Sequence, residues 1–160
     1  MRLFDVSMAL GLLGLISPAT AQAEPCPSGI VGDPGAPPTT SSGTAVVANQ
    51  ASTELSGEEI LAPGWRLRTR TITFAPGAIV SLHSHDKRPE MATMLVGTVM
   101  IYQLGCKLPI AMRPHEVHSN GRGVAHWAVN ESKEFAVMYV TDLVAEESFP
   151  ITDDHGTEAK

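Results

Sequence analysis

The chain has 160 residues and a formal net charge of −6, with 11 Lys and Arg residues against 17 Asp and Glu. This length fits one compact domain and leaves little room for a second. An acidic chain without a Lys/Arg cluster offers little to a phosphate backbone or an anionic membrane, so we expect no nucleic-acid partner.

Residues 1–23 have the layout of a secretory signal peptide. Arg2 precedes an apolar run over 8–16, and cleavage would follow the small residues Ala21 or Ala23. A membrane anchor is the alternative, but this apolar run is far shorter than the ~20 residues that a hydrocarbon core requires. We therefore expect a periplasmic or secreted protein that does not insert into a membrane after the signal is removed.

Residues 24–43 are rich in Pro, Gly, Ser and Thr. Such a composition buries too little apolar surface to offset chain entropy, which predicts an extended arm or linker. Cys26 in this arm and Cys106 further on are the two cysteines of the chain. In an oxidising compartment they could pair and tie the arm to the domain, and two unlinked thiols are the alternative.

Residues 44–150 have the pattern of an all-β domain, and an acidic tail follows at 151–160. Short segments with strand character are separated by turn residues such as Gly, Pro, Asn and Ser. The expected strands lie at 44–49, 65–74, 79–85, 91–104, 123–130 and 134–143. One short helix near 52–59 is the competing helical candidate. Many short strands without helical crossovers favour an antiparallel sandwich or barrel.

The stretch GAIVSLHSHDKRPEMATMLVG, residues 77–97, carries the strongest chemical signal. Alternate side chains of a strand share a face, so His83 and His85 can converge on one ion. The segment DKRP has turn composition, which places Glu90 at the start of the neighbouring strand, across from the two histidines. Downstream, His126 lies in an otherwise apolar strand.

Together, these four side chains predict a metal site. Burying a carboxylate and three imidazoles without an ion is costly in desolvation, whereas a divalent metal uses their lone pairs. Three nitrogens and one carboxylate leave about two positions open on a six-coordinate metal, where a substrate and dioxygen or water could bind. Iron, manganese, nickel or copper suit such a site, and zinc is satisfied by the four ligands alone.

The spacing of the first three of these residues resembles a known motif. Gly77, five residues, His83, one residue, His85, four residues, Glu90, six residues and Gly97 resembles the first motif of the cupin family in full. The resemblance covers roughly Trp65 to Leu143 and implies a single-domain cupin jelly-roll barrel.

The second cupin motif is matched in part. Gly123, His126 and Asn130 agree with its second half, whereas His115 stands in place of its first glycine and Gly121 in place of its proline. Both departures concern the turn rather than the ligands. The resemblance, which extends to small exported bacterial cupins, implies that the metal is held by His83, His85, Glu90 and His126.

For function, the open metal positions and the resemblance favour a dioxygenase-like oxidoreductase that acts on a small organic molecule able to chelate the ion. No separate general base is evident, so Glu90 would serve both as ligand and as proton acceptor. The alternative is a non-catalytic protein for metal-dependent binding of a small ligand, metal handling or sensing. The sequence leaves a homodimer open.

Other polar residues have simpler interpretations. His115 and His118 could form an alternative ligand set, but their neighbours favour a solvent-exposed strand end and turn. Arg66, Arg68 and Arg70 alternate along one strand and share a face. This face could bind an anionic substrate, but we expect it to be solvated.

Overall fold

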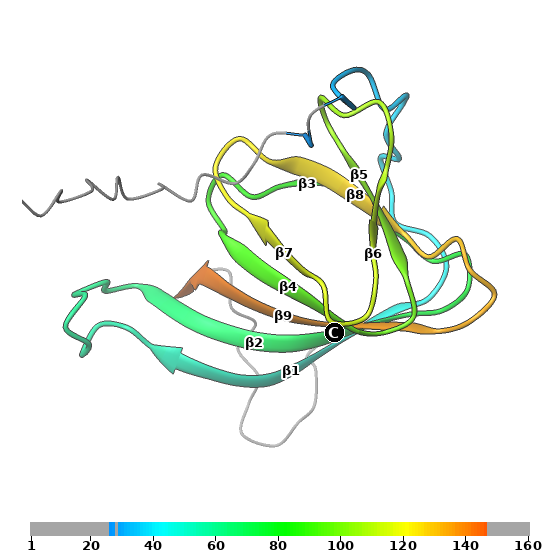
Figure 1. Cartoon of the computed structure of the whole chain (residues 1–160). Coiled ribbons are helices and arrows are strands. Elements are labelled where there is room, and N and C mark those ends of the chain that lie inside the picture. Colours follow the sequence, from blue (N-terminus) through cyan, green and yellow to red (C-terminus); the bar gives the residue numbers. More distant parts are fainter. Residues whose placement is uncertain (1–25, 28, 147–160) are drawn as a thin grey trace, which may run out of the picture.

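The computed structural model describes residues 26–27 and 29–146, so the predicted signal peptide and the acidic tail lie outside the described residues. The described part is all β, and none of it forms a helix long and apolar enough to span a membrane. Two antiparallel sheets face each other (Figure 1). This architecture confirms the predicted jelly-roll sandwich.

The larger sheet has five strands in the order β1-β2-β9-β4-β7. Their bounds are β1 Ala45–Glu54, β2 Trp65–Phe74, β9 Ala136–Ala145, β4 Glu90–Val96 and β7 Val117–Asn120. The smaller sheet has four strands in the order β3-β8-β5-β6. They are β3 Ile79–Ser84, β8 Ala125–Val129, β5 Val99–Gln103 and β6 Ile110–Met112.

The strand prediction differs from the structure in part. The short helix that the sequence left open near 52–59 does not form, because β1 continues to Glu54 in register with β2 and turns follow it. The segment 91–104 is two strands rather than one, and they meet at Gly97. This glycine has φ 73°, and a Cβ there would lie 2.7 Å from the Phe135 carbonyl oxygen, so only glycine fits the turn.

The barrel interior divides along its axis into an apolar and a polar half. Alternate residues of each strand point inward, and the hydrophobic core is formed by Phe74, Ala78, Ala92, Met94, Val99, Ile101, Met112, Ala128, Ala136, Met138 and Val140. Towards the opposite end of the same strands, the inward positions become polar. Arg68 of β2 and Glu90 of β4 both pair in register with Asp142 of β9. The strand register thus gathers the charged residues at one end.

The N-terminal arm is attached to the smaller sheet. Cys26 and Cys106 form a disulfide, which confirms the pairing that the sequence left open. Val31 bridges to Cys106, and Ser42 bridges to Ile79 at the start of β3. The described part of the arm therefore runs along the barrel rather than away from it.

Candidate metal centre

His83 and His85 reach the polar half from the end of β3. A β-bulge between Val80 and His83 shifts the register of β3 against β8. Because of this shift, the side chains of Val80 and His83 both line the cavity although the two residues are an odd number of positions apart. His85 follows the last residue of the strand and is fully buried, and its amide donates to the carbonyl of Val124 at 2.9 Å.

A second contact fixes the loop that follows His85. The carboxylate of Asp86 accepts hydrogen bonds from the Gly123 amide at 2.7 Å and from the Ser84 hydroxyl at 2.9 Å. These two bonds lower the pKa of Asp86. They tie the loop to the turn that precedes β8, and so they hold the two predicted motifs together.

The hydrogen bonds of His83 and His85 define how their rings face the interior. His83 Nδ1 lies 2.9 Å from the Ser81 carbonyl oxygen, and His85 Nδ1 lies 3.1 Å from the Arg88 carbonyl oxygen. A carbonyl only accepts, so each Nδ1 carries the proton and each Nε2 keeps a lone pair. This is the arrangement by which backbone carbonyls orient histidine ligands of metals.

His126, on β8, completes the cluster. It pairs in register with His83, and its Nε2 lies 3.3 Å from Nε2 of His85. One ligand nitrogen from each of the three histidines lies within 4.8 Å of the others, and the ring centroids are 4.6–5.0 Å apart. The structure thus brings together the three histidines that the sequence predicted as ligands.

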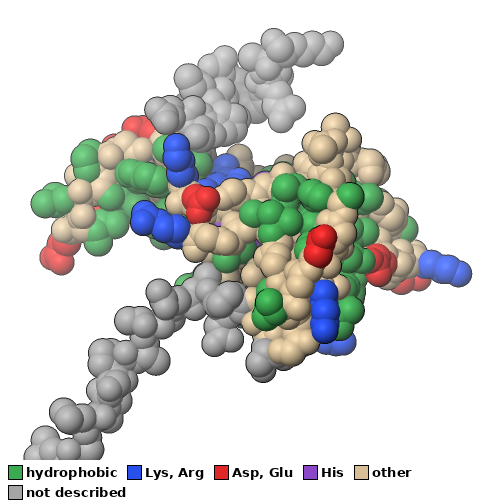
Figure 2. Space-filling view, turned by 90° about the horizontal axis from the view of Figure 1, so that it is seen from above, with side chains coloured by type: hydrophobic (Ala, Val, Ile, Leu, Met, Phe, Trp, Pro, Cys, Tyr) green, Lys and Arg blue, Asp and Glu red, His purple; other side chains and the backbone are tan. Residues whose placement is uncertain are grey.

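The donor set fits a divalent transition metal. Burial, and then the neighbouring His83 and His85, lower the pKa of His126 to about 2, and burial lowers the pKa of His85 as well. Both rings are therefore neutral near pH 7, the form that coordinates a metal. Nδ1 of His126 is buried without a hydrogen-bond partner among the described residues. Histidine side chains are largely hidden on the face shown in Figure 2.

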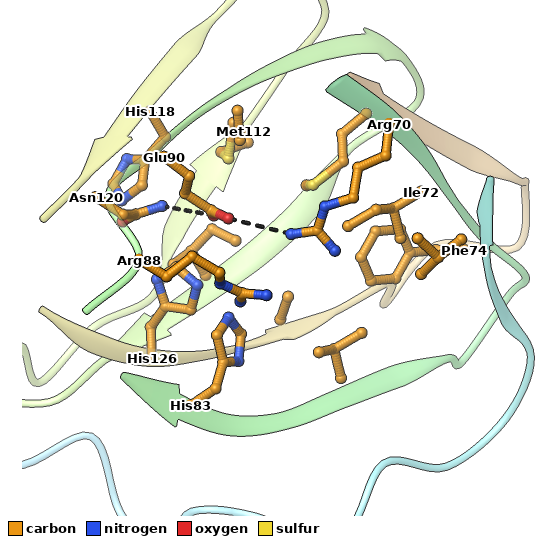
Figure 3. Close-up of a pocket in the computed structure, with 16 residues that line it drawn as sticks. Arg70, Ile72, Phe74, His83, Arg88, Glu90, Met112, His118, Asn120 and His126 are labelled. Carbon is orange, nitrogen blue, oxygen red and sulfur yellow. Dashed lines mark hydrogen bonds and ion pairs between the residues drawn. The ribbon is translucent and has the colours of Figure 1, made fainter. Parts of the chain in front are cut away.

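Glu90 lies at the edge of this cluster. Its Oε1 is 3.6 Å from His85 Nε2 and accepts a hydrogen bond from Asn120 Nδ2 at 3.1 Å, while Oε2 accepts from Arg70 at 3.4 Å (Figure 3). Both oxygens are therefore held by the surrounding protein. Glu90 is close enough to coordinate an ion at the histidines, but Arg70 and Asn120 hold its carboxylate beside the cluster.

Arg68 and Arg70 correct one sequence-based expectation. We expected their face of β2 to be solvated, yet the two residues are only 7% and 8% exposed. The reason is the carboxylate of Asp142, which lies 2.7 Å from Arg68 and 3.2 Å from Arg70. Arg88 approaches the same carboxylate at 3.9 Å. Arg68 and Arg70 share one face of β2 with the apolar Ile72 and Phe74, and this shared face was the sign in the sequence that they point inward.

The histidines open onto a cavity of about 210 Å³ inside the barrel (Figure 3). Its apolar wall is formed by Ile72, Phe74, Ile101, Met112, Ala128 and Met138. Its polar wall includes Arg70, Arg88, Glu90, Asn120 and His118. A cavity of this size has room for a small organic molecule.

His118 is the second correction. We expected it at an exposed strand end, but it projects inward from β7, lines the cavity, and has a buried Nε2 without a partner among the described residues. Burial lowers its pKa. Strand β7 was not predicted, and therefore the inward positions of His118 and Asn120 on it were not predicted either. His115, by contrast, is exposed as expected.

No protein-family model matches this chain, and no curated protein does either. Solved structures do match its fold. The crystal structure of a predicted oxalate decarboxylase from Thermotoga maritima has 16% identity and a TM-score of 0.51, with 65% of this chain and 84% of that chain covered. An uncharacterized conserved protein with a double-stranded β-helix domain, from Klebsiella pneumoniae, has 15% identity and a TM-score of 0.50, with 67% and 82% covered.

A third neighbour is a cupin domain from Bordetella pertussis, with 17% identity and a TM-score of 0.49, and with 63% of this chain and 94% of that chain covered. At such identities the likeness concerns the fold alone. The likeness supports a double-stranded β-helix fold for this chain. The histidine cluster inside the barrel is an observation on this chain itself. The chain has the cupin fold, as the motif resemblance predicted.

Proposed function

We propose that this protein is a metal-dependent cupin that binds a small organic ligand inside the barrel and oxidises it with dioxygen as a dioxygenase-like enzyme. The observation that supports it best is the convergence of His83, His85 and His126 at the wall of the barrel cavity. One imidazole nitrogen from each of the three would hold one divalent ion, for which iron, manganese, copper, nickel and zinc are the candidates. When bound, the ion would supply Lewis-acid or redox chemistry.

The remaining residues of the cavity have separable tasks. The backbone carbonyls of Ser81 and Arg88 orient two of the histidines. The apolar wall keeps water away from the ligand, which strengthens polar contacts inside the cavity. Glu90, held by Arg70 and Asn120, is the carboxylate nearest to the cluster and the candidate fourth ligand and proton acceptor.

One observation favours the second candidate, a non-catalytic protein that binds a small ligand through its metal. Both oxygens of Glu90 are already hydrogen-bonded within the protein, which restrains it as a base. Oxygen consumption by protein loaded with each metal separates the two functions. Turnover that is lost in Glu90→Gln while the metal is retained supports the enzyme, whereas metal and ligand binding without oxygen uptake supports the binder.

We further propose that the protein is exported. The signal-peptide pattern and the Cys26–Cys106 disulfide support this, because disulfides persist in oxidising compartments. N-terminal sequencing of protein from the exported fraction should find Gln22 or Glu24 as the first residue. Met1 at the N-terminus of exported protein would contradict the proposal.

A further inference from the structure

The polar half contains a network of charged side chains. Arg68, Arg70 and Arg88 contact the carboxylates of Asp142 and Glu90, with distances of 2.7–3.9 Å between charged atoms. Arg88 makes the longest of these contacts, to Asp142 at 3.9 Å. A divalent ion at the histidines would add positive charge beside Arg88. Positive charge without a close counter-charge is unfavourable in a low-dielectric interior, so the network favours a negatively charged ligand.

Arg88 is the member of the network best placed to receive such a ligand. Its nearest carboxylate is Asp142 at 3.9 Å, beyond hydrogen-bond range, and that carboxylate already accepts two hydrogen bonds from Arg68. The side chain of Arg88 is 32% exposed and extends into the cavity that His83 and His126 also line (Figure 3).

Arg88 also lines a second hollow, a groove of about 590 Å³. Lys87 and Arg122 lie along this groove, and Asp86 is the one acidic residue among the described residues that line it. Arg88 therefore borders both the groove and the cavity. Within the described part of the chain, the two hollows together are lined by five basic residues and two acidic ones. On a protein of net charge −6, this is a local basic path that would steer an anion inward.

Two buried atoms of the cavity also lack partners among the described residues. Nε of Arg70, a residue that is 8% exposed, donates to nothing, and Nε2 of His118 has no partner either. Buried polar groups are normally satisfied, so both atoms point to a polar ligand in the cavity.

We propose that the ligand is a small organic acid whose carboxylate binds Arg88 and which enters along the groove of Lys87 and Arg122. This inference rests on the proposed function, since the acid would also contact the ion held by the histidines. Guanidinium and carboxylate match in geometry and form paired charge-assisted hydrogen bonds. The cavity volume of about 210 Å³ suits a small acid.

Lactate and lactamide are suitable probes because they share size, hydroxyl and carbonyl groups and differ in charge. Their binding to Co²⁺-loaded protein is measured by calorimetry and by the visible spectrum of Co²⁺. We expect lactate to bind at least ~10-fold more tightly than lactamide, and Arg88→Gln to weaken lactate ~10- to 100-fold while lactamide stays within about twofold. Arg88→Lys should recover part of the loss, and it also serves if Arg88→Gln does not fold.

Arg113→Gln is the matched control, because Arg113 is 65% exposed on its side chain and pairs with Glu116 away from the cavity. It should leave lactate binding unchanged. Arg122→Gln should slow lactate association and reduce its salt dependence, with little effect on affinity.

The outcomes separate this inference from the metal site. Equal lactate affinity in wild type and Arg88→Gln, with Co²⁺ bound in both, overturns the inference alone. Sulfate that displaces lactate as well as lactate itself does so too, because the site would then be a general oxyanion site. If the wild type fails to bind Co²⁺, the proposed metal centre is overturned and this inference with it.

Discussion

The two halves of the barrel interior are built on the same strands, but one half buries apolar side chains and the other buries charged and polar ones. Along β2 the inward residues change from Arg68 and Arg70 to Ile72 and Phe74, and along β9 they change from Asp142 to Val140. The apolar half stabilises the fold by burial. The polar half buries charge at a cost and is not needed to close the barrel, since pairs of buried ions contribute little net stability.

This difference indicates where the functional site lies. A half that is unfavourable for stability persists when it binds something, and here it contains the three histidines, the cavity and buried nitrogens that have no partner among the described residues. Substitutions in the apolar half should therefore change stability and leave the site intact, whereas substitutions in the polar half should change binding, and should change stability only where they leave a charge unpaired.

The largest effect is expected from Asp142→Asn in the polar half. Removal of this carboxylate takes away the negative charge that lies 2.7 Å from the buried guanidinium group of Arg68 and 3.2 Å from that of Arg70. We expect a loss of about 3–5 kcal/mol in the free energy of unfolding, measured by urea denaturation. A loss below 1 kcal/mol would show that the network is not buried as described.

The apolar half is tested by Met94→Ala. Met94 is fully buried, and its replacement should reduce the free energy of unfolding by about 2–5 kcal/mol without changing metal affinity. Met91→Ala is the matched control, because Met91 lies on the same strand but is 61% exposed, and it should change stability by less than about 0.5 kcal/mol. Altered metal affinity in folded Met94→Ala would contradict the claim that the apolar half does not affect the metal site.

The pH dependence of stability tests whether the histidines of the polar half are buried in their neutral form. Burial lowers the pKa values of His85, His118 and His126, the last to about 2, so the unfolded chain binds more protons than the folded one as the pH falls below about 6.5. Stability of the metal-free protein is thus complete above the unfolded pKa and declines below it.

His126, whose pKa is lowered to about 2, should contribute about 1.4 kcal/mol per pH unit in that range. Urea denaturation of wild type and His126→Gln at pH 6 and pH 4, with a chelator present, measures the contribution of His126. The decline should be less steep in the variant. Parallel curves would mean that His126 is not buried in its neutral form.

The smallest effect is expected at His115, outside both halves. This residue has φ 71°, the left-handed conformation that the glycine of the cupin motif would adopt without strain. His115→Gly should therefore change the free energy of unfolding by less than about 1 kcal/mol, since relief of strain is offset by added freedom of the unfolded chain. Metal affinity should not change, and a loss of it would restore His115 as a candidate ligand.

The sequence predicted the parts of the site that depend on local spacing. His83, His85 and His126 were found from motif spacing and strand alternation, and His115 shows that a departure from the motif need not alter its turn. For Arg68 and Arg70, the shared face with Ile72 and Phe74 was a sign of an inward position, but the carboxylate that pairs with them, Asp142, lies on a strand distant in sequence.

What could not be predicted depends on pairing between distant strands. His118 required a strand, β7, whose four residues have no apolar alternation of their own and which is stabilised by its ladder with β4. The bulge in β3 that directs His83 inward is likewise a property of its register with β8. The metal ligands lie in two short sequence motifs, whereas the cavity around them is lined by residues from strands that are distant in sequence.

The central claim, that the polar half is a metal centre, is tested most directly by the gain in the free energy of unfolding on adding Co²⁺. At 100 times its Kd, the ion should stabilise wild type by about 2.7 kcal/mol, and it should stabilise Met94→Ala by the same amount, although that variant starts from a lower stability. His126→Ala should gain nothing. An equal gain in His126→Ala would contradict the account, because the ion would then bind elsewhere.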